Sequence, residues 1–271
     1  MGADPLKSAR TKLARANLHK TTARREAGRF FNRCPDPAFR IEPEDDEETS
    51  SFAVGAVHRC RLIVGTAPPE LPGSFAARFG DAIYNYRCAL DHVAWQLVAH
   101  GTSWPLARRQ TFGVQFPIYS TEAEFAANRN RRLPGVDRAA IDFIEARHHY
   151  TRGNATNDAL LGIANLSNDD KHRELHVFLS LFKTLETHVT FTRCRPLSWD
   201  NPPRRPALKE GAVLAHFSYV ITGQDPEMKM ELRPQAQIVI EDGRDFSEML
   251  EGIAREVREI LDAPEILAAV T

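Results

Sequence analysis

Residues 80–98 constrain the fold most, because a helix sorts this stretch into two distinct faces. At about 100° per residue, one side of such a helix carries the apolar residues Ile83, Tyr86, Leu90, Val93, Ala94 and Leu97. The other side carries Asp81, Asn85, Cys88 and His92, in a stripe about 60° wide. A carboxylate, an amide, a thiol and an imidazole in one row make this face a candidate for chemistry. We predict a central helix over residues 74–99.

Helical periodicity recurs on both sides of this segment. Asp4 and Pro5 form a typical helix start, followed by small or apolar residues at spacings of three and four. A basic helix is therefore predicted over residues 5–31. Further helices are predicted over residues 121–128, 136–149, 154–176 and 246–262.

Alternation of polar and apolar residues predicts antiparallel strands elsewhere. The predicted strands or hairpins cover residues 40–42, 51–66, 114–119, 177–182, 188–195, 212–221 and 228–240. The fold class is α+β: a helical core of helices 74–99, 136–149 and 154–176, with an antiparallel sheet and flanking N- and C-terminal helices. We predict a single domain over residues 1–271, with a β-rich part at 177–241.

Composition is typical of a soluble globular protein. The 271 residues are 42% hydrophobic and 26% charged, with a net charge of -1. The sequence has no N-terminal apolar run typical of a signal peptide and no apolar stretch of about 20 residues that could span a bilayer. The four cysteines are too far apart for a zinc finger or thioredoxin motif. We therefore predict a cytoplasmic protein with reduced thiols and no membrane partner.

A second polar stretch covers residues 166–176. If its helix is continuous, Asn165, Asn168, His172 and His176 lie on one stripe. A new N-cap at Ser167 or Asn168 would change that alignment. By contrast, we interpret His148 and His149, beside Glu145, as surface residues rather than ligands.

Arg87 and His92 match the spacing Arg-x4-His. This spacing resembles the signature of HEPN-superfamily ribonucleases, helical proteins that cleave RNA without a metal, often across a dimer. The resemblance implies that His92 acts on the 2′-hydroxyl or the leaving oxygen, while Arg87 stabilises charge on the phosphate. The two residues lie about 140° apart on a regular helix, so convergence needs long side-chain reach or a partner subunit.

The chain also resembles a group of uncharacterised, mostly bacterial proteins. These proteins pair a Gly-Asp-x3-Asn-x-Arg-x-Ala-Leu-Asp-His helix with a later Asn-x-Asp-Lys-His-Arg stretch. The corresponding segments here are residues 80–92 and 168–173. The resemblance implies that both motifs belong to one site, and it implies no particular activity.

The first functional hypothesis is cleavage of RNA or another phosphate ester without a cofactor. His92 is the predicted acid/base, with His172 as a second acid/base or orienting group. Arg87 and either Lys171 or Arg173 would contact the phosphate. The full candidate set is His92, Arg87, His172, Asp91, Lys171, Arg173, Asn85 and Asn168. The basic helix and the arginines at 129–132 would help to hold a polyanion, and the Arg-x4-His resemblance allows a homodimer.

Two alternatives stay open from the sequence. His172 and His176, at i, i+4, could bind one divalent transition metal together with His92 and Asp81. The protein would then be a metal-dependent hydrolase or oxygenase.

The other alternative is a non-catalytic binding or assembly protein. In that case Asp81 caps the central helix, and the polar residues form a seam between helices. Asn85 and His92 would hydrogen-bond to Asn168 and His172 across that seam.

Overall fold

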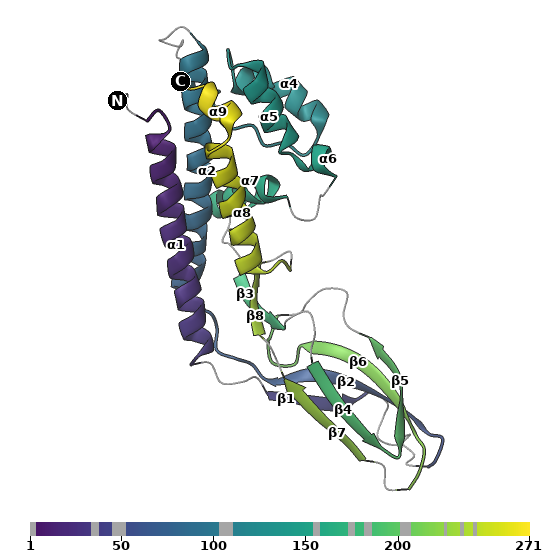
Figure 1. Ribbon diagram of the computed structural model, residues 1–271. Coiled ribbons are helices and arrows are strands. Elements are labelled where there is room, and N and C mark those ends of the chain that lie inside the picture. Colours follow the sequence, from purple (N-terminus) through teal and green to yellow (C-terminus); the bar gives the residue numbers. More distant parts are fainter. Residues whose placement is uncertain are drawn as a thin grey trace. The chain divides into compact units, whose positions relative to one another are not determined.

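The computed structural model describes residues 4–33, 38–44, 53–102, 111–153, 158–172, 177–181, 186–200, 207–224, 227–233, 236–240 and 243–271. Its helices and antiparallel strands confirm the predicted α+β class (Figure 1). The chain divides into two compact units. A helical unit comprises Met1–Ala27, Gly73–Leu175 and Phe246–Thr271, and a β unit comprises Gly28–Pro72 and His176–Asp245. This division does not test the prediction of a single domain, which stays a prediction.

The helical unit is organised around α2 (Gly73–Gly101), the predicted central helix. All six of the residues predicted to form its apolar face are at most 1% exposed, because they are the residues that a 3.6-residue repeat gathers on one side. The helix α7 (Ala159–His172) packs against both α2 and α8 (Phe246–Leu261), and α8 also contacts α2. This packing confirms the predicted association of the central helix with the helix of the second motif.

The basic helix α1 (Lys7–Phe31) contacts both long helices through polar pairs. The Tyr86 hydroxyl of α2 donates to Asn17 Oδ1 at 2.8 Å, and Lys20 Nζ donates to Glu251 of α8 at 3.0 Å. Small buried residues, such as Ala16 and Ala23, line its inner side. Arg10 and Arg24 also form ion pairs, with Asp262 and Glu251, so part of the positive charge of the basic helix that was predicted to hold a polyanion is used within the unit.

Shorter helices complete the unit. They are α4 (Glu122–Arg132), α5 (Arg138–Ala146), α6 (His149–Arg152) and α9 (Pro264–Ala268). The predicted helix 136–149 is wrong at both ends: Asp137 caps α5 by accepting from the Ala139 N–H, and α5 ends at Ala146 before α6 begins. The helix α5 packs on α6 and α9. The predicted start of α7 at 154 lies outside the described residues.

Two glycines allow the end of α2 to approach the turn before α5. A Cβ at Gly101 would lie 2.2 Å from the Gly135 carbonyl oxygen, which no real side chain tolerates. Gly135 itself has a φ of +72°, a conformation that glycine adopts without steric cost. This close contact holds the 111–135 region against the C-terminal end of the central helix.

The β unit contains a four-stranded antiparallel sheet in the order β1-β2-β6-β5. Its strands are β1 (Ala38–Pro43), β2 (Val57–Thr66), β6 (Val213–Ile221) and β5 (Cys194–Asp200). Two further antiparallel pairs join β3 (Val177–Leu181) to β8 (Ala236–Ile240) and β4 (Glu186–Thr192) to β7 (Glu227–Arg233). Cys60, Leu62 and Phe217 are among the buried residues of the larger sheet.

Three strand predictions are wrong in detail. The predicted strand 188–195 is interrupted at Arg193, which has a φ of 59° and separates β4 from β5. The predicted strand 228–240 is two strands, β7 and β8, which pair with different partners. Residues 114–119 form no strand, because the backbone of Phe116 hydrogen-bonds to side chains of α2 instead of to another strand.

No helix in the described part of the chain is long and apolar enough to cross a membrane.

Candidate functional site

The Arg87–Asp91 pair of α2 holds the backbone of Phe116. Arg87 Nε and Nη2 lie 3.2 and 2.9 Å from the Asp91 carboxylate. Arg87 Nη2 also donates to the Phe116 carbonyl oxygen at 2.9 Å, and Asp91 Oδ1 accepts from the Phe116 N–H at 2.9 Å. The Phe116 side chain is fully buried. One i, i+4 ion pair therefore satisfies both backbone groups of a buried residue that has no strand partner.

The polar stripe of α2 makes contacts within its own unit. The Asn85 side chain is buried and donates to the Asp81 carbonyl oxygen, one turn earlier, at 2.7 Å. The side-chain N–H of Asn85 therefore bonds within α2 and not to Asn168 as predicted. Asp81 lies inside α2 and not at its start, so the predicted cap is wrong. Its carboxylate instead lies 3.6 Å from His19 Nδ1 of α1.

His92 is half-buried in a different environment from that of Arg87. Burial lowers the pKa of His92, and the positive charge of Lys12 on α1 lowers it further, against a smaller opposite effect of Asp91. The imidazole is therefore neutral at neutral pH. Arg87 is bonded to the 114–119 segment, whereas the positive neighbour of His92 lies on α1. The helix separates the two residues of the Arg-x4-His pattern, as its geometry requires.

The second motif lies in α7, which packs against α2. Asn168 is exposed. The backbone of Lys171 and His172 belongs to the last turn of α7, but their side chains, and the whole of Arg173 and His176, lie outside the described residues. Whether these groups meet His92 stays a prediction.

The metal hypothesis depends on the same undescribed groups. Two of its four ligands, His172 and His176, have side chains outside the described part of the chain. Among the residues that are described, no three His, Cys, Asp or Glu side chains lie close enough together to hold a metal ion. The metal site with His92 and Asp81 therefore stays a prediction.

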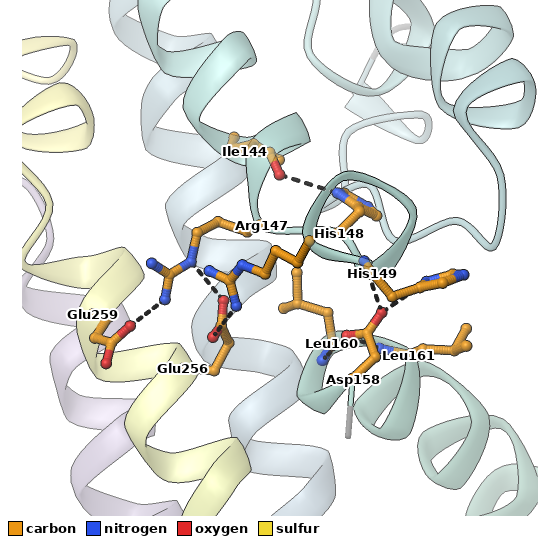
Figure 2. A network of polar contacts seen from close by, with 10 residues as sticks. Ile144, Arg147, His148, His149, Asp158, Leu160, Leu161, Glu256 and Glu259 are labelled. Atoms are coloured by element: carbon orange, nitrogen blue, oxygen red, sulfur yellow. Dashed lines mark hydrogen bonds and ion pairs between the residues drawn. The ribbon is translucent and has the colours of Figure 1, made fainter. Parts of the chain in front are cut away.

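A polar pocket that the sequence did not indicate lies between α6, the start of α7 and α8. Its volume is about 200 Å³. The residues that line it are Arg147, His149, Arg152, Asp158, Ala159, Gly252, Arg255, Glu256 and Glu259. Figure 2 shows Arg147 directed at the two glutamates of α8, while His149 turns toward Asp158.

Glu256 is the buried centre of the ionic part of this pocket. Its side chain is 9% exposed and accepts from Arg147 Nε at 2.6 Å and from Arg152 Nη1 at 3.1 Å. Arg147 also bonds to Glu259. Burial alone would lower the pKa of Arg147, but its bonds to Glu256 and Glu259 outweigh that effect and raise it. The bond to Arg147 likewise lowers the pKa of Glu259.

Asp158 orients His149 at the other side of the pocket. Its side chain is 5% exposed, and Oδ1 caps α7 by accepting from the N–H groups of Leu160 and Leu161 at 2.8 and 3.1 Å. Its Oδ2 lies 2.9 Å from His149 Nδ1. Because an ionised carboxylate only accepts, Nδ1 carries the proton and the lone pair of a neutral His149 is on Nε2. This arrangement can accept or donate a proton at Nε2.

The interpretation of His148 as a surface residue is wrong, whereas His149 is 16% exposed and lines the pocket. His148 is fully buried, with Nδ1 3.0 Å from the Ile144 carbonyl oxygen, and burial lowers its pKa. One sequence signal could have found this region. Glu256 lies among Ile253, Val257 and Ile260 on the apolar side of α8, and a buried carboxylate requires a cationic partner.

Comparison of the chain with models of known protein families, with curated proteins and with solved structures finds no match. The resemblances to HEPN ribonucleases and to the two-motif bacterial group therefore stay predictions.

Proposed function

We propose that the helical unit is a non-catalytic binding or assembly module in which the polar residues of α2 hold the helices and the 111–135 region in place. The bonds from Arg87 and Asp91 to both backbone groups of Phe116 carry this proposal. A phosphate bound to Arg87 would have to compete with an ionised carboxylate and a carbonyl oxygen already in contact. Asn85, another candidate, also uses its side-chain donor within α2.

The test separates stability from turnover. Arg87→Ala and His92→Ala are compared with the unaltered chain by thermal unfolding and by cleavage of mixed-sequence RNA in the presence of a chelator. We expect no RNA cleavage by any of the three proteins, and a lower Tm for Arg87→Ala. Chelator-resistant cleavage by the unaltered chain that is lost in a folded His92→Ala variant would overturn the proposal.

A metal-independent ribonuclease that acts as a homodimer is the second candidate. It is favoured by the side of α2 on which Tyr84 is 46% exposed and Cys88 and His92 are partly exposed. A second copy placed on this side could bring an arginine to His92, because Arg87 of the same chain is already bonded to Asp91 and to the Phe116 carbonyl oxygen. Analytical ultracentrifugation together with the RNA assay tests this candidate, because it requires both a dimer and His92-dependent cleavage.

We also propose a cytoplasmic location. Cys60, Cys88 and Cys194 are free thiols, which is the usual state of cysteines in a reducing compartment. Titration of the freshly isolated protein with a thiol reagent tests this proposal, since a disulfide among these residues would contradict it.

A further inference from the structure

The pocket between α6, α7 and α8 has hydrogen-bonding groups that its own residues do not use. Its carboxylates are engaged: Glu256 accepts from two arginines, Glu259 accepts from Arg147, and Asp158 accepts from His149 and from the start of α7. The N–H groups of Arg147 that point into the network are bonded to the two glutamates. The internal charges of the pocket are thus paired.

The groups of the pocket that these ion pairs do not use are cationic N–H donors and one imidazole nitrogen. Arg255 lines the pocket, is exposed, and makes no hydrogen bond or ion pair with any residue that the structure describes. Arg152 bonds to Glu256 through Nη1, and its side chain is 40% exposed. Nε2 of His149 is the third group, and it donates when the ring is protonated.

The geometry points to a binding site for a small ligand that carries an oxyanion, a phosphate or a carboxylate group, held by Arg255, Arg152 and His149. Guanidinium groups present planar pairs of N–H donors that match the oxygens of such groups. The arginines and acids that line the pocket are equal in number, three each, so a protonated His149 would balance a singly charged ligand. The site is distinct from the α2 motif and does not depend on its proposed role.

The volume of the pocket limits the size of the ligand. About 200 Å³ is below the range of about 300–1,000 Å³ that is typical of sites for drug-sized molecules. The pocket therefore fits a small organic acid or the phosphate end of a larger ester. Asp158 fixes the ring of His149 through Nδ1, so Nε2 is held in place to share a proton with the bound group.

Isothermal titration calorimetry on the full chain tests the site with two probes, inorganic phosphate and acetate, at constant ionic strength in chloride. We expect saturable binding of at least one probe, and the two arms distinguish phosphate from carboxylate recognition. Arg255→Gln should weaken that binding by about 10- to 100-fold, as the loss of a charged hydrogen bond predicts. Arg255 makes no hydrogen bond or ion pair with a described residue, and its charge helps to lower the pKa of the exposed Glu259. Because exposed charges contribute little to stability, this variant should change the Tm little.

Arg258→Gln is the matched control. Arg258 is exposed on the same helix and does not line the pocket, so its removal lowers the net charge equally without touching the site. His149→Gln provides a second test, with an expected loss of binding and retention of the circular dichroism spectrum. The proposal is overturned if neither probe binds saturably, or if Arg255→Gln and Arg258→Gln bind the probe equally well.

Discussion

The α2 motif and the pocket beside α8 contain the same kinds of side chain but use them differently. In α2, Arg87 and Asp91 bond to each other and to the backbone of Phe116, although the Asp91 side chain is 35% exposed. In the pocket, Arg147 and Glu256 form ion pairs in which neither Arg255 nor Nε2 of His149 takes part. A row of reactive residue types therefore does not identify a site. Hydrogen-bond donors that are not used by the protein's own ion pairs are a better indication of a binding site.

The largest expected effect is the loss of the α2 pair. Arg87→Ala leaves the Phe116 carbonyl and the Asp91 carboxylate without their shared donor. Because Asp91 is 35% exposed, we expect a loss of about 2–3 kcal/mol in the free energy of unfolding, below the full value for a buried pair. In a protein of this size that corresponds to a fall in Tm of about 4–12 °C, measured by scanning calorimetry.

The control for that prediction is an identical spacing in α5. Arg138 and Asp142 also form an i, i+4 pair, 2.8 Å apart, but their side chains are 69% and 50% exposed. Arg138→Ala should leave the Tm unchanged, because exposed pairs contribute little. Equal shifts in the two variants would show that the contact with Phe116 adds nothing to stability, and Arg87 and Asp91 would then be no more structural than an exposed pair.

The second effect concerns the buried carboxylate of the pocket. Glu256→Gln keeps the shape of the side chain but removes the charge that faces Arg147 and Arg152. We expect a loss of about 1–3 kcal/mol in unfolding free energy, measured by urea titration. Arg255→Gln should change the unfolding free energy little in the same titration, because its charge acts on the exposed Glu259. A destabilising Arg255→Gln would mean that this arginine belongs to the fold and not to a ligand.

A smaller effect is stabilisation of the folded chain by an anion. If phosphate occupies the pocket, phosphate at ten times its Kd should add about 1.4 kcal/mol to the unfolding free energy. The corresponding rise in Tm is about 3–5 °C in the unaltered chain and in Arg87→Gln alike, since α2 takes no part in the site. If the rise is retained in His149→Gln, phosphate is acting elsewhere on the protein.

The smallest effect is the dependence of stability on pH. Burial lowers the pKa of His148 below its usual 6.5, and the pKa of His92 is lowered in the same direction. The unfolded chain therefore takes up protons first as the pH falls, so these residues stabilise the fold above about pH 6.5 and lose that contribution below it. The urea concentration at the midpoint of unfolding should therefore decrease as the pH is lowered from 7 to 5.

Two variants assign that slope. His148→Gln should flatten the pH dependence even if it lowers stability at every pH, whereas His100→Gln, at the exposed end of α2, should leave the slope as it is. The pKa values of Glu259 and Glu251 are also lowered. Their contribution to stability is lost in a separate pH range, below about pH 4.5. A profile that is flat between pH 7 and pH 5 would contradict the assignment to His148.

The sequence by itself determined the local structure of this protein. The apolar period of residues 83–97 predicted the central helix and its buried side, and alternation predicted the antiparallel strands, because both patterns repeat with the geometry of one element. It also separated Arg87 from His92 on the helix surface. The pattern of residues 114–119 fits both a strand and an extended segment without a strand partner, and the predicted strand was wrong there.

Only the tertiary structure decided what the polar residues do. Asp91 meets a backbone N–H 25 residues away, and Arg147 meets Glu256 across 109 residues. Spacing along a helix determines which side a residue occupies, but the segment packed against that side is chosen by the burial of the whole chain. For this reason the same Arg-x3-Asp spacing supports Phe116 in α2 and lies in solvent in α5.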